Sequence, residues 1–234
     1  MKLSKLSRAV VAASLLATGA AAHAEITTSG SVAFTSDYKY RGISQTSGGP
    51  AVQGGLTASH DSGLYFAVWG SSINFTDSGL EIDPSIGYTF SSGDVTYDVG
   101  VLYYGYPSAN DPDELNFTEF YGSVAFGGAK VGLAYTPDYT GAFEDHIYAY
   151  VSYGTEIGGF GLSTSLGYNK LLDSKDSFIA GKDDDNYIDY KIGVSKEIAG
   201  LAVEVAYIGS DLKKSDWGNN DVEGKVIATV SKAF

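Results

Sequence analysis

The chain has 234 residues and a formal net charge of −13, with 28 acidic residues against 15 basic ones. Because nucleic-acid phosphates attract basic surfaces, this balance disfavours nucleic-acid binding. Cysteine does not occur in the sequence, which excludes a disulfide framework, a thiolate metal site and a cysteine nucleophile.

The first 24 residues predict a cleaved secretory signal peptide. Lys2, Lys5 and Arg8 form a positive segment, and a short apolar stretch follows it. The sequence Ala-His-Ala, which ends at Ala24, matches the small-residue pattern of a cleavage site. A membrane-anchoring helix is the alternative, but the apolar stretch is too short to span a bilayer. We therefore expect residues 1–24 to be removed and residues 25–234 to form one exported domain.

Apolar and polar side chains alternate along the exported part of the chain, which is typical of half-buried strands. The alternation is clear at residues 26–41, 80–90, 160–168, 187–195 and 226–234. About twelve such segments, each of roughly 9–13 residues, fit tilted membrane-spanning strands better than the shorter strands of soluble proteins. After Ala24 no uninterrupted apolar run reaches the length of a membrane-spanning helix.

The predicted connections alternate between tight turns and long loops. Each tight turn contains glycine, which hairpin turns with positive φ favour. The turns lie at His60–Gly63, Ser91–Asp94, Gly127–Gly128, Ile157–Gly159 and Ala199–Gly200. The long loops, which hold more than half of the acidic residues, lie at Ile43–Gly49, Asn74–Ser78, Pro107–Glu114, Asp138–Asp145, Lys170–Asn186 and Asp211–Asp221. Short periplasmic turns and long extracellular loops are typical of outer-membrane barrels. The sequence thus predicts an all-β fold, a transmembrane antiparallel up-and-down β-barrel of about 12 strands.

Aromatic residues gather near both ends of the predicted strands. Near the long loops lie Tyr38, Tyr40, Tyr103, Tyr106, Phe117, Tyr135, Tyr139, Tyr148, Tyr168 and Tyr187. Near the tight turns lie Phe90, Tyr97, Phe126, Phe160 and Phe234. We expect two aromatic girdles at the two lipid–water interfaces. A general preference of Tyr and Phe for strands explains their number but not this clustering.

The chain ends in a strand pattern at Val226–Phe234. In lipid every backbone polar group needs a partner, so we expect this strand to close the sheet by pairing with the segment from Ile26. A terminal Phe234 after alternating apolar residues resembles the signal by which the barrel-assembly machinery recognises its substrates. Lys232 occupies a position where that signal usually has an aromatic residue, and its amine can extend to the lipid headgroups.

Five stretches occur together in the same order as in one known family. They are Tyr40–Thr46, Tyr97–Gly100, Tyr103–Pro107, Tyr135–Tyr139 and Ser231–Phe234. The chain resembles the TorF-like porin family, a proteobacterial family of formerly unknown function, over nearly its whole exported length. The resemblance implies a porin-like barrel in the outer membrane of a Gram-negative cell. It brings no settled substrate and no catalytic residues.

If the apolar side chains face lipid, the charged side chains of the opposite parity face the lumen and are candidate pore-lining residues. They are Asp37, Lys39, Arg41, Glu81, Asp83, Asp98, Glu119, Asp189, Lys191, Glu204 and Lys225. Such charges need water or partners, so they either line a polar pore or pair into a plug. Acids outnumber bases, which predicts a weakly cation-preferring channel for passive diffusion of small polar solutes or ions. A closed barrel that displays acidic loops, as an adhesin, a receptor or a structural protein, is the alternative.

Three local features carry further expectations. Arg41 could bind an anionic solute or position the first long loop, but we favour a salt bridge to an acid on a neighbouring strand. Pro137 predicts a bend from strand to loop. Asp183–Asp185 lacks the glycine and glutamate of an EF-hand and is interpreted as a solvated acidic loop, with divalent bridging to lipopolysaccharide phosphates as the alternative.

The sequence does not favour an enzyme. The exported part contains only two histidines, His60 and His146, and the predicted topology places them at opposite ends of the barrel. They therefore cannot share a metal, and we interpret His146 as an ordinary rim residue. A dyad of Asp145 and His146 with a nearby serine is a weak signal. We expect no catalytic, metal or cofactor site; the expected partners are outer-membrane lipid, lipopolysaccharide, the assembly machinery and small polar solutes.

Overall fold

The structure is a computed structural model that describes residues 25–75, 78–112, 115–139, 145–172, 185–217 and 221–234. The predicted signal peptide at residues 1–24 lies outside the described residues. None of the described helices has the length and apolar character needed to cross a membrane.

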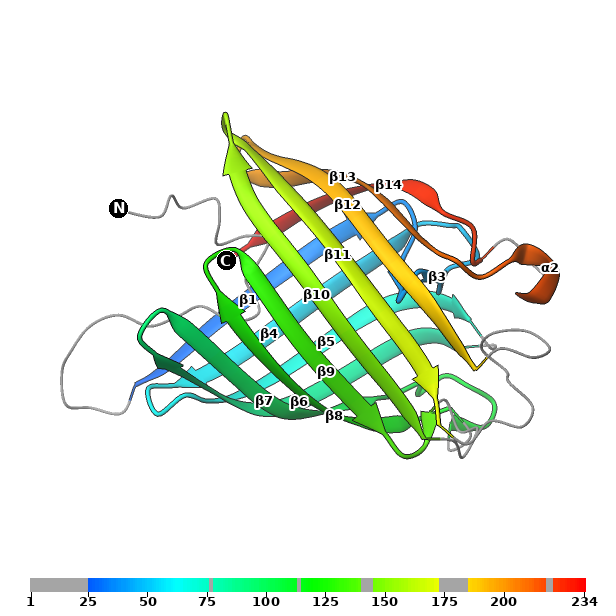
Figure 1. The fold of residues 1–234 in the computed structure, drawn as a ribbon, viewed down its shortest axis with the longest axis horizontal. Coiled ribbons are helices and arrows are strands. Elements are labelled where there is room, and N and C mark those ends of the chain that lie inside the picture. Colours follow the sequence, from blue (N-terminus) through cyan, green and yellow to red (C-terminus); the bar gives the residue numbers. More distant parts are fainter. Residues whose placement is uncertain (1–24, 76–77, 113–114, 140–144, 173–184, 218–220) are drawn as a thin grey trace.

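The described residues form twelve long antiparallel strands that close into one barrel (Figure 1). The strands are β1 Ile26–Thr35, β4 Ala51–His60, β5 Leu64–Phe75, β6 Ser78–Ser92, β7 Val95–Tyr104, β8 Phe117–Phe126, β9 Ala129–Thr136, β10 His146–Ile157, β11 Phe160–Leu171, β12 Asn186–Ile198, β13 Leu201–Ser210 and β14 Lys225–Ala233. Each pairs with the long strands next to it in the sequence, and β14 pairs with β1. The predicted up-and-down barrel of about twelve strands is therefore confirmed.

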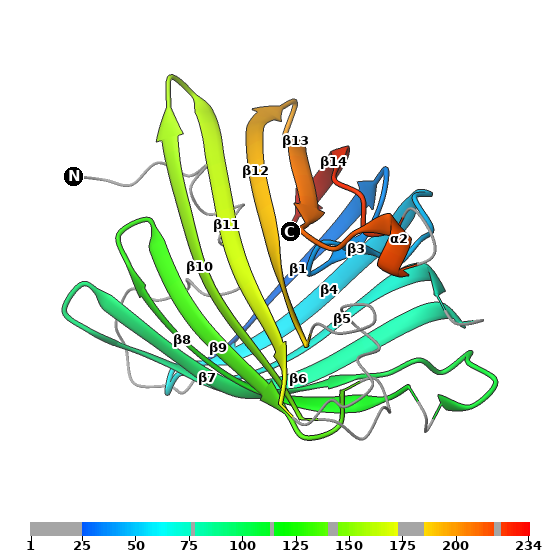
Figure 2. The same ribbon diagram turned by 45° about the vertical axis from the view of Figure 1, so that its right-hand side comes forward.

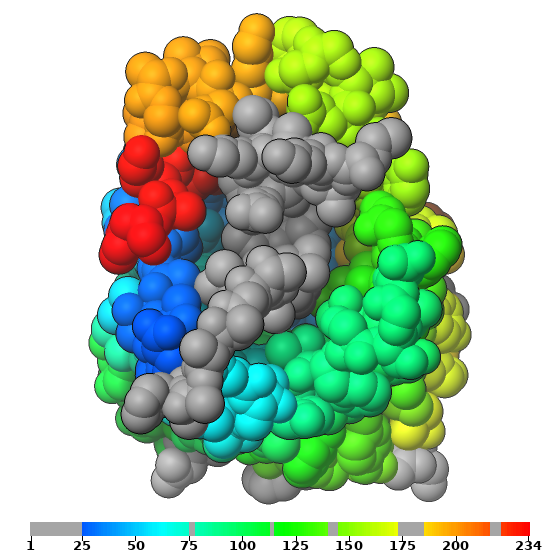
Figure 3. Space-filling view, turned by 90° about the vertical axis from the view of Figure 1, so that its left-hand side faces the viewer, coloured from blue at the N-terminus to red at the C-terminus, as the bar shows by residue number. Residues whose placement is uncertain are grey.

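The closing pair joins the two ends of the chain. Phe34 lies opposite Val230, and Ser31 lies opposite Ala233. Beyond the strand, the backbone N–H of Phe234 donates to the carbonyl of Gly30 at 3.0 Å, and the N–H of Gly30 donates back at 2.9 Å. Figure 3 views the barrel from the end with the tight turns, where β1 in blue and β14 in red lie side by side. The predicted pairing of the last strand with the first is confirmed.

The side chains of the strands divide by polarity between the two faces of the sheet. Phe34, Val52 and Ile192 are 55%, 62% and 64% exposed on the outer face. Glu81 and Glu119, in contrast, are almost fully buried inside. Apolar patches of this extent on an outer surface mark contact with lipid or another apolar partner. The expected orientation, with apolar side chains outward and polar ones inward, is confirmed.

The connections also follow the prediction, with one exception. Tight turns join the strands at one end, and the connections at 36–50, 105–116, 137–145, 172–185 and 211–224 lie at the other end (Figures 1 and 2). The exception is the loop predicted at Asn74–Ser78, because β5 and β6 extend until only residues 76–77 separate them. β9 ends at Thr136, directly before Pro137, as predicted.

Three short elements lie in the long connections. The connection 36–50, which we call the inner loop, contains β2 (Lys39–Tyr40) and β3 (Ile43–Ser44), and α2 (Lys214–Trp217) lies between β13 and β14. The expected first strand at 26–41 is therefore too long. It ends at Thr35 because the chain then folds back on itself as a separate two-stranded hairpin.

The prediction of two aromatic girdles is correct at one end only. Phe90, Phe126, Phe160 and Phe234 are exposed on the outer face near the tight turns. At the other end Tyr103 and Tyr168 are exposed, but most of the expected girdle points inward. The inward residues are Tyr38, Tyr40, Tyr106, Phe117, Tyr139, Tyr148 and Tyr187. Tyr38 and Tyr40 belong to the inner loop itself, and they pack against the apolar cluster inside the barrel, which includes Ile43 of the same loop.

Candidate functional site in the barrel lumen

The structure shields all eleven candidate pore-lining side chains from the outer face. Six of them are buried carboxylates, namely Asp37, Glu81, Asp83, Asp98, Glu119 and Asp189. Of the other five, the Arg41 side chain is 6% exposed, and Lys39, Lys191, Glu204 and Lys225 are half-buried. These side chains fall into three groups. Some belong to the inner loop or contact it, some form ion pairs on the barrel wall, and some are carboxylates without a basic partner. Whether they line a conducting path stays a prediction.

Asp37 organises the inner loop from its centre. Its Oδ1 accepts hydrogen bonds from the hydroxyls of Ser44, at 2.6 Å, and Thr46, at 3.0 Å. Lys225 on β14 lies 3.9 Å from its Oδ2. A buried carboxylate needs such partners, and here they come from the returning half of the same loop. Asp37 therefore fixes the fold of the loop rather than facing open lumen.

The tip of the inner loop crosses the lumen through Arg41. Its guanidinium contacts Glu119 on β8 at 2.5 Å and lies 4.1 Å from the ring centre of Tyr148 on β10. The expected salt bridge is confirmed, but its partner is across the barrel and not on a neighbouring strand. His146 Nδ1 lies 3.4 Å from the same guanidinium. His146 is fully buried, so its interpretation as an ordinary rim residue is wrong.

An apolar cluster surrounds the inner loop and narrows the long-loop end of the lumen. Its buried members are Ile43, Ile73, Tyr104, Tyr106, Phe117, Tyr139, Leu171, Tyr187 and Val222. Tyr104 stacks on Phe117 with ring centres 4.3 Å apart, and Tyr139 stacks on His146 at the same separation. Sequence reasoning missed this cluster because inward and outward aromatics at a strand end look alike in composition.

The lysines of the lumen are held by oxygen atoms. Lys191 pairs with Glu204 at 2.9 Å. The Lys39 amine donates to the backbone carbonyls of Asp221 and Glu223, both at 2.8 Å, and so ties the inner loop to the last long connection. Burial lowers the pKa of the Lys39 amine from its ordinary value, and the nearby carboxylate of Asp37 opposes this effect.

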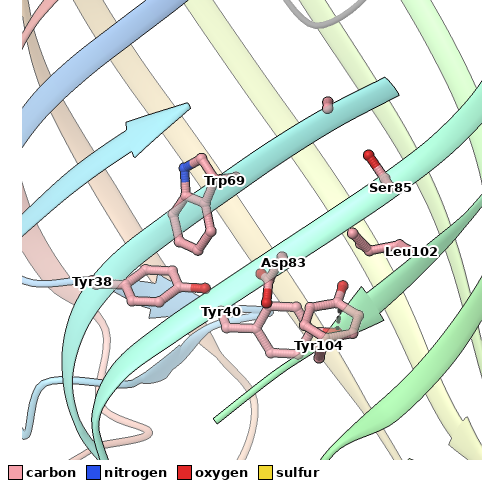
Figure 4. A pocket seen from close by; sticks show the side chains of 8 residues that line it. Tyr38, Tyr40, Trp69, Asp83, Ser85, Leu102 and Tyr104 are labelled. Carbon is pink, nitrogen blue, oxygen red and sulfur yellow. Dashed lines mark hydrogen bonds between the residues drawn. The ribbon is translucent and has the colours of Figure 1, made fainter. Parts of the chain in front are cut away.

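Four lumen carboxylates have no basic side chain within salt-bridge distance among the described residues. Asp98 accepts a hydrogen bond from the Tyr65 hydroxyl at 2.9 Å, and Asp189 accepts one from the Asn169 amide at 2.9 Å. Glu81 and Asp83 differ because each has a buried oxygen, Oε2 and Oδ1 respectively, without any hydrogen-bond partner. Asp83 lines a cavity of about 250 Å³ (Figure 4). Each of these two carboxyl groups therefore keeps one open acceptor position inside the lumen.

The described residues also bear on the expected absence of a metal site and on the acidic loop. No group of three or more histidine, aspartate or glutamate side chains there could hold a metal ion. His60 ends β4 at the tight-turn end and His146 begins β10 at the other, as expected. Asp183 and Asp184 of the acidic loop lie outside the described residues, whereas Asp185 pairs with Lys170. Divalent bridging by this loop stays a prediction.

The barrel is similar to two solved porins. One is titled "NanC porin structure in rhombohedral crystal form", with a TM-score of 0.51 and 9% identity, and the match covers 88% of this chain and 98% of that one. The other is titled "KdgM porin", with a TM-score of 0.53, 9% identity and the same coverage. At this identity the likeness shows the fold alone, which is that of a porin-like outer-membrane barrel.

Comparison of sequences gives the family. No curated protein matches the chain. One family model, described as "Bacterial protein of unknown function (Gcw_chp)", matches residues 19–234 and so covers the whole described barrel. The chain belongs to the Gcw_chp family of bacterial proteins of unknown function.

Proposed function

We propose that the protein is an outer-membrane channel through which small polar solutes or ions diffuse passively, with a weak preference for cations. The observation that carries the proposal is the orientation of the barrel wall, which is apolar outside and charged inside. The porin-like fold and the resemblance to the TorF-like porins support a location in the outer membrane and a role other than that of an enzyme.

The charge of the lumen supports the preference for cations. Glu81, Asp83, Asp98 and Asp189 are inward carboxylates without a basic side chain within salt-bridge distance among the described residues. The described lysines and arginine of the candidate set, in contrast, contact carboxylates or backbone carbonyls. Uncompensated negative charge in a low-dielectric lumen raises the local concentration of cations.

The outer surface supports the expected partners. The exposed apolar belt is suited to lipid tails and places the acidic loops beside lipopolysaccharide. Phe234 is 70% exposed, which leaves its ring accessible to the barrel-assembly machinery before membrane insertion. Binding of this end to the machinery is tested with a synthetic peptide of residues 225–234 and a matched peptide that lacks Phe234.

A liposome-swelling assay tests the proposal. Liposomes that contain refolded protein are expected to swell in iso-osmotic solutions of small neutral solutes, at rates that fall as solute size increases. In solutions of salts that share one small anion, the swelling rate is likewise expected to fall as the size of the cation increases. Rates equal to those of empty liposomes would contradict the proposal.

One observation favours the second candidate, a closed barrel that displays acidic loops. The inner loop and its apolar cluster narrow the mouth at the long-loop end. If they close it fully, the native barrel does not conduct, whereas a variant without residues 38–45 does. If the channel proposal holds, the native barrel conducts and the variant only conducts more.

A further inference from the structure

We infer that the lumen holds a binding site for a small organic cation with a primary ammonium or guanidinium group, formed by Asp83 and two aromatic pairs, with Glu81 beside Asp83 on the same face of β6. This inference rests on the proposed function, because it names a class of solute for the same lumen.

The two carboxylates are fixed on one face of β6. Glu81 and Asp83 are two residues apart, so both side chains point inward, where they are 2% and 5% exposed. Pro84 follows them and has no N–H to donate. The ladder to β7 has no paired residues between the bridge Ile82–Gly105 and the pair Ser85–Leu102. Asp83 thus lies in this gap of the ladder, and Glu81 lies one residue beyond the bridge at Ile82.

The described protein atoms satisfy the pair only in part. The Tyr106 hydroxyl reaches Glu81 Oε1 at the long distance of 3.5 Å, while Oε2 of Glu81 and Oδ1 of Asp83 are buried without a hydrogen-bond partner. Buried carboxylates are costly unless a cation or several donors satisfy them. The two oxygens without a donor, Glu81 Oε2 and Asp83 Oδ1, are open acceptor positions that point to a ligand from solution.

Aromatic rings form the rest of the site. Tyr38 packs edge-on against Trp69 with ring centres 5.4 Å apart, and Tyr40 packs edge-on against Tyr104 at 5.6 Å. Figure 4 shows the Asp83 carboxylate between these two pairs, on the wall of the cavity of about 250 Å³. Ring faces attract cations, and the attraction is stronger where water is excluded.

The chemistry of the site favours an organic cation over a metal ion. The unsatisfied acceptors need N–H donors, which ammonium and guanidinium groups supply. A hard metal ion needs six or more oxygen ligands, whereas the cavity is lined by a single carboxylate, Asp83, and by aromatic rings. Because Tyr38 and Tyr40 belong to the inner loop, the ligand lies between that loop and the wall formed by β5, β6 and β7.

Tryptophan fluorescence provides a direct test of binding. The chain has two tryptophans, Trp69 in the cavity and Trp217 in α2, so the variant Trp217→Phe leaves Trp69 as the reporter. This variant, refolded in detergent, is titrated with n-butylammonium chloride, and n-butanol, sodium chloride and magnesium chloride are titrated separately. We expect a saturable change in Trp69 emission with n-butylammonium alone.

Two charge-removing substitutions and one control complete the test. Glu81→Gln and Asp83→Asn, each in the Trp217→Phe background, are expected to weaken butylammonium binding about tenfold or more. Asp98→Asn removes the same charge from the lumen outside the cavity and is expected to leave the affinity within about twofold. Heat-modified mobility on gels shows whether each variant has folded; if one has not, the ligand series on Trp217→Phe decides.

Each other outcome overturns the inference in a different way. Equal responses to butanol mean an apolar cavity, and equal responses to sodium or magnesium mean an inorganic cation site. No saturable response means that the carboxylates satisfy each other, for example by sharing a proton. Binding of n-butylammonium in detergent does not require conduction. A barrel that conducts potassium chloride but does not bind n-butylammonium overturns only this inference. A barrel that binds n-butylammonium but does not conduct overturns only the proposed channel function.

Discussion

At the scale of single residues, Arg41 links the inner loop to distant parts of the wall. Its side chain is 6% exposed and that of its partner Glu119 is 5% exposed, so the pair is shielded from water. The ring of Tyr148 covers the guanidinium from a second strand. A buried charge that loses its partner is expensive, so this contact holds the loop in place more strongly than a surface ion pair does.

Removal of one partner is therefore expected to destabilise the barrel. Arg41→Ala should lower the free energy of unfolding by about 3–5 kcal/mol, because it leaves Glu119 buried and unpaired. The double variant Arg41→Ala/Glu119→Ala should lose clearly less than the sum of the two single variants. Urea unfolding from lipid vesicles measures all three.

The pair Lys191–Glu204 is the matched control, because it also spans the lumen wall but is 29% and 22% exposed. Its coupling energy should stay at or below about 1 kcal/mol. If the losses of stability in Arg41→Ala and Glu119→Ala simply add up in the double variant, the Arg41–Glu119 pair does not hold the inner loop in place.

Only part of the contacts around Arg41 could be predicted from the sequence. It predicted that Arg41 would be paired, because inward charges need partners. It could not identify Glu119, because the partner depends on how far the loop reaches across the barrel. His146 was misjudged for the same reason: only the folded loop brings Arg41 against its ring.

At the scale of elements, the inner loop fills part of the lumen at the long-loop end. Its hairpin of β2 and β3 pairs internally, and Ser44 also donates a backbone hydrogen bond to Asp221 at 2.8 Å. These contacts fix the loop inside the mouth of the barrel, where it packs against the apolar cluster.

Shortening the inner loop should therefore widen the channel. Replacement of residues 38–45 by a short Gly-Ser segment is expected to raise the single-channel conductance at least about twofold, because a larger cross-section transmits more ions. Replacement of Lys214–Trp217 in α2 by Gly-Ser residues is the control and should change it little. An unchanged conductance in the first variant would show that the loop does not limit the flow.

The closing contact between β1 and β14 makes a second element-scale prediction. A Cβ added at Gly30 would lie 2.6 Å from a ring atom of Phe234, whereas one added at Gly79 would meet nothing within 4 Å. Gly30→Val should therefore lower the fraction of closed, heat-modifiable barrel after refolding, and Gly79→Val should not. Equal folding yields would show that this packing is not needed for closure.

At the scale of the whole molecule, the alternation of side chains determined most of what could be predicted. Lipid outside and water inside require one apolar face per strand, so strand number, strand pairing and the direction of residues such as Phe34 and Glu119 followed from the pattern. The long-loop end did not follow, because a loop such as residues 36–50 can extend outward or fold inward with the same composition.

The complete barrel combines a constricted end with a negatively charged interior. The aromatics Tyr104, Phe117 and Tyr139 and the inner loop fill part of the lumen at the long-loop end, and seven of the eleven candidate lumen side chains are acidic. Under the proposed channel function, the first feature would limit the size of a solute and the second would select its charge. Both act only if the narrowed mouth still lets solutes pass.

Single-channel recording in planar lipid bilayers tests most directly whether the barrel is a weakly cation-preferring channel. The native barrel, refolded and inserted between unequal potassium chloride solutions, is expected to give discrete conductance steps with a reversal potential that shows a weak preference for potassium. An absence of steps, with the variant lacking residues 38–45 conducting under the same conditions, would contradict a channel, and a reversal potential that favours chloride would contradict the role assigned to the lumen carboxylates.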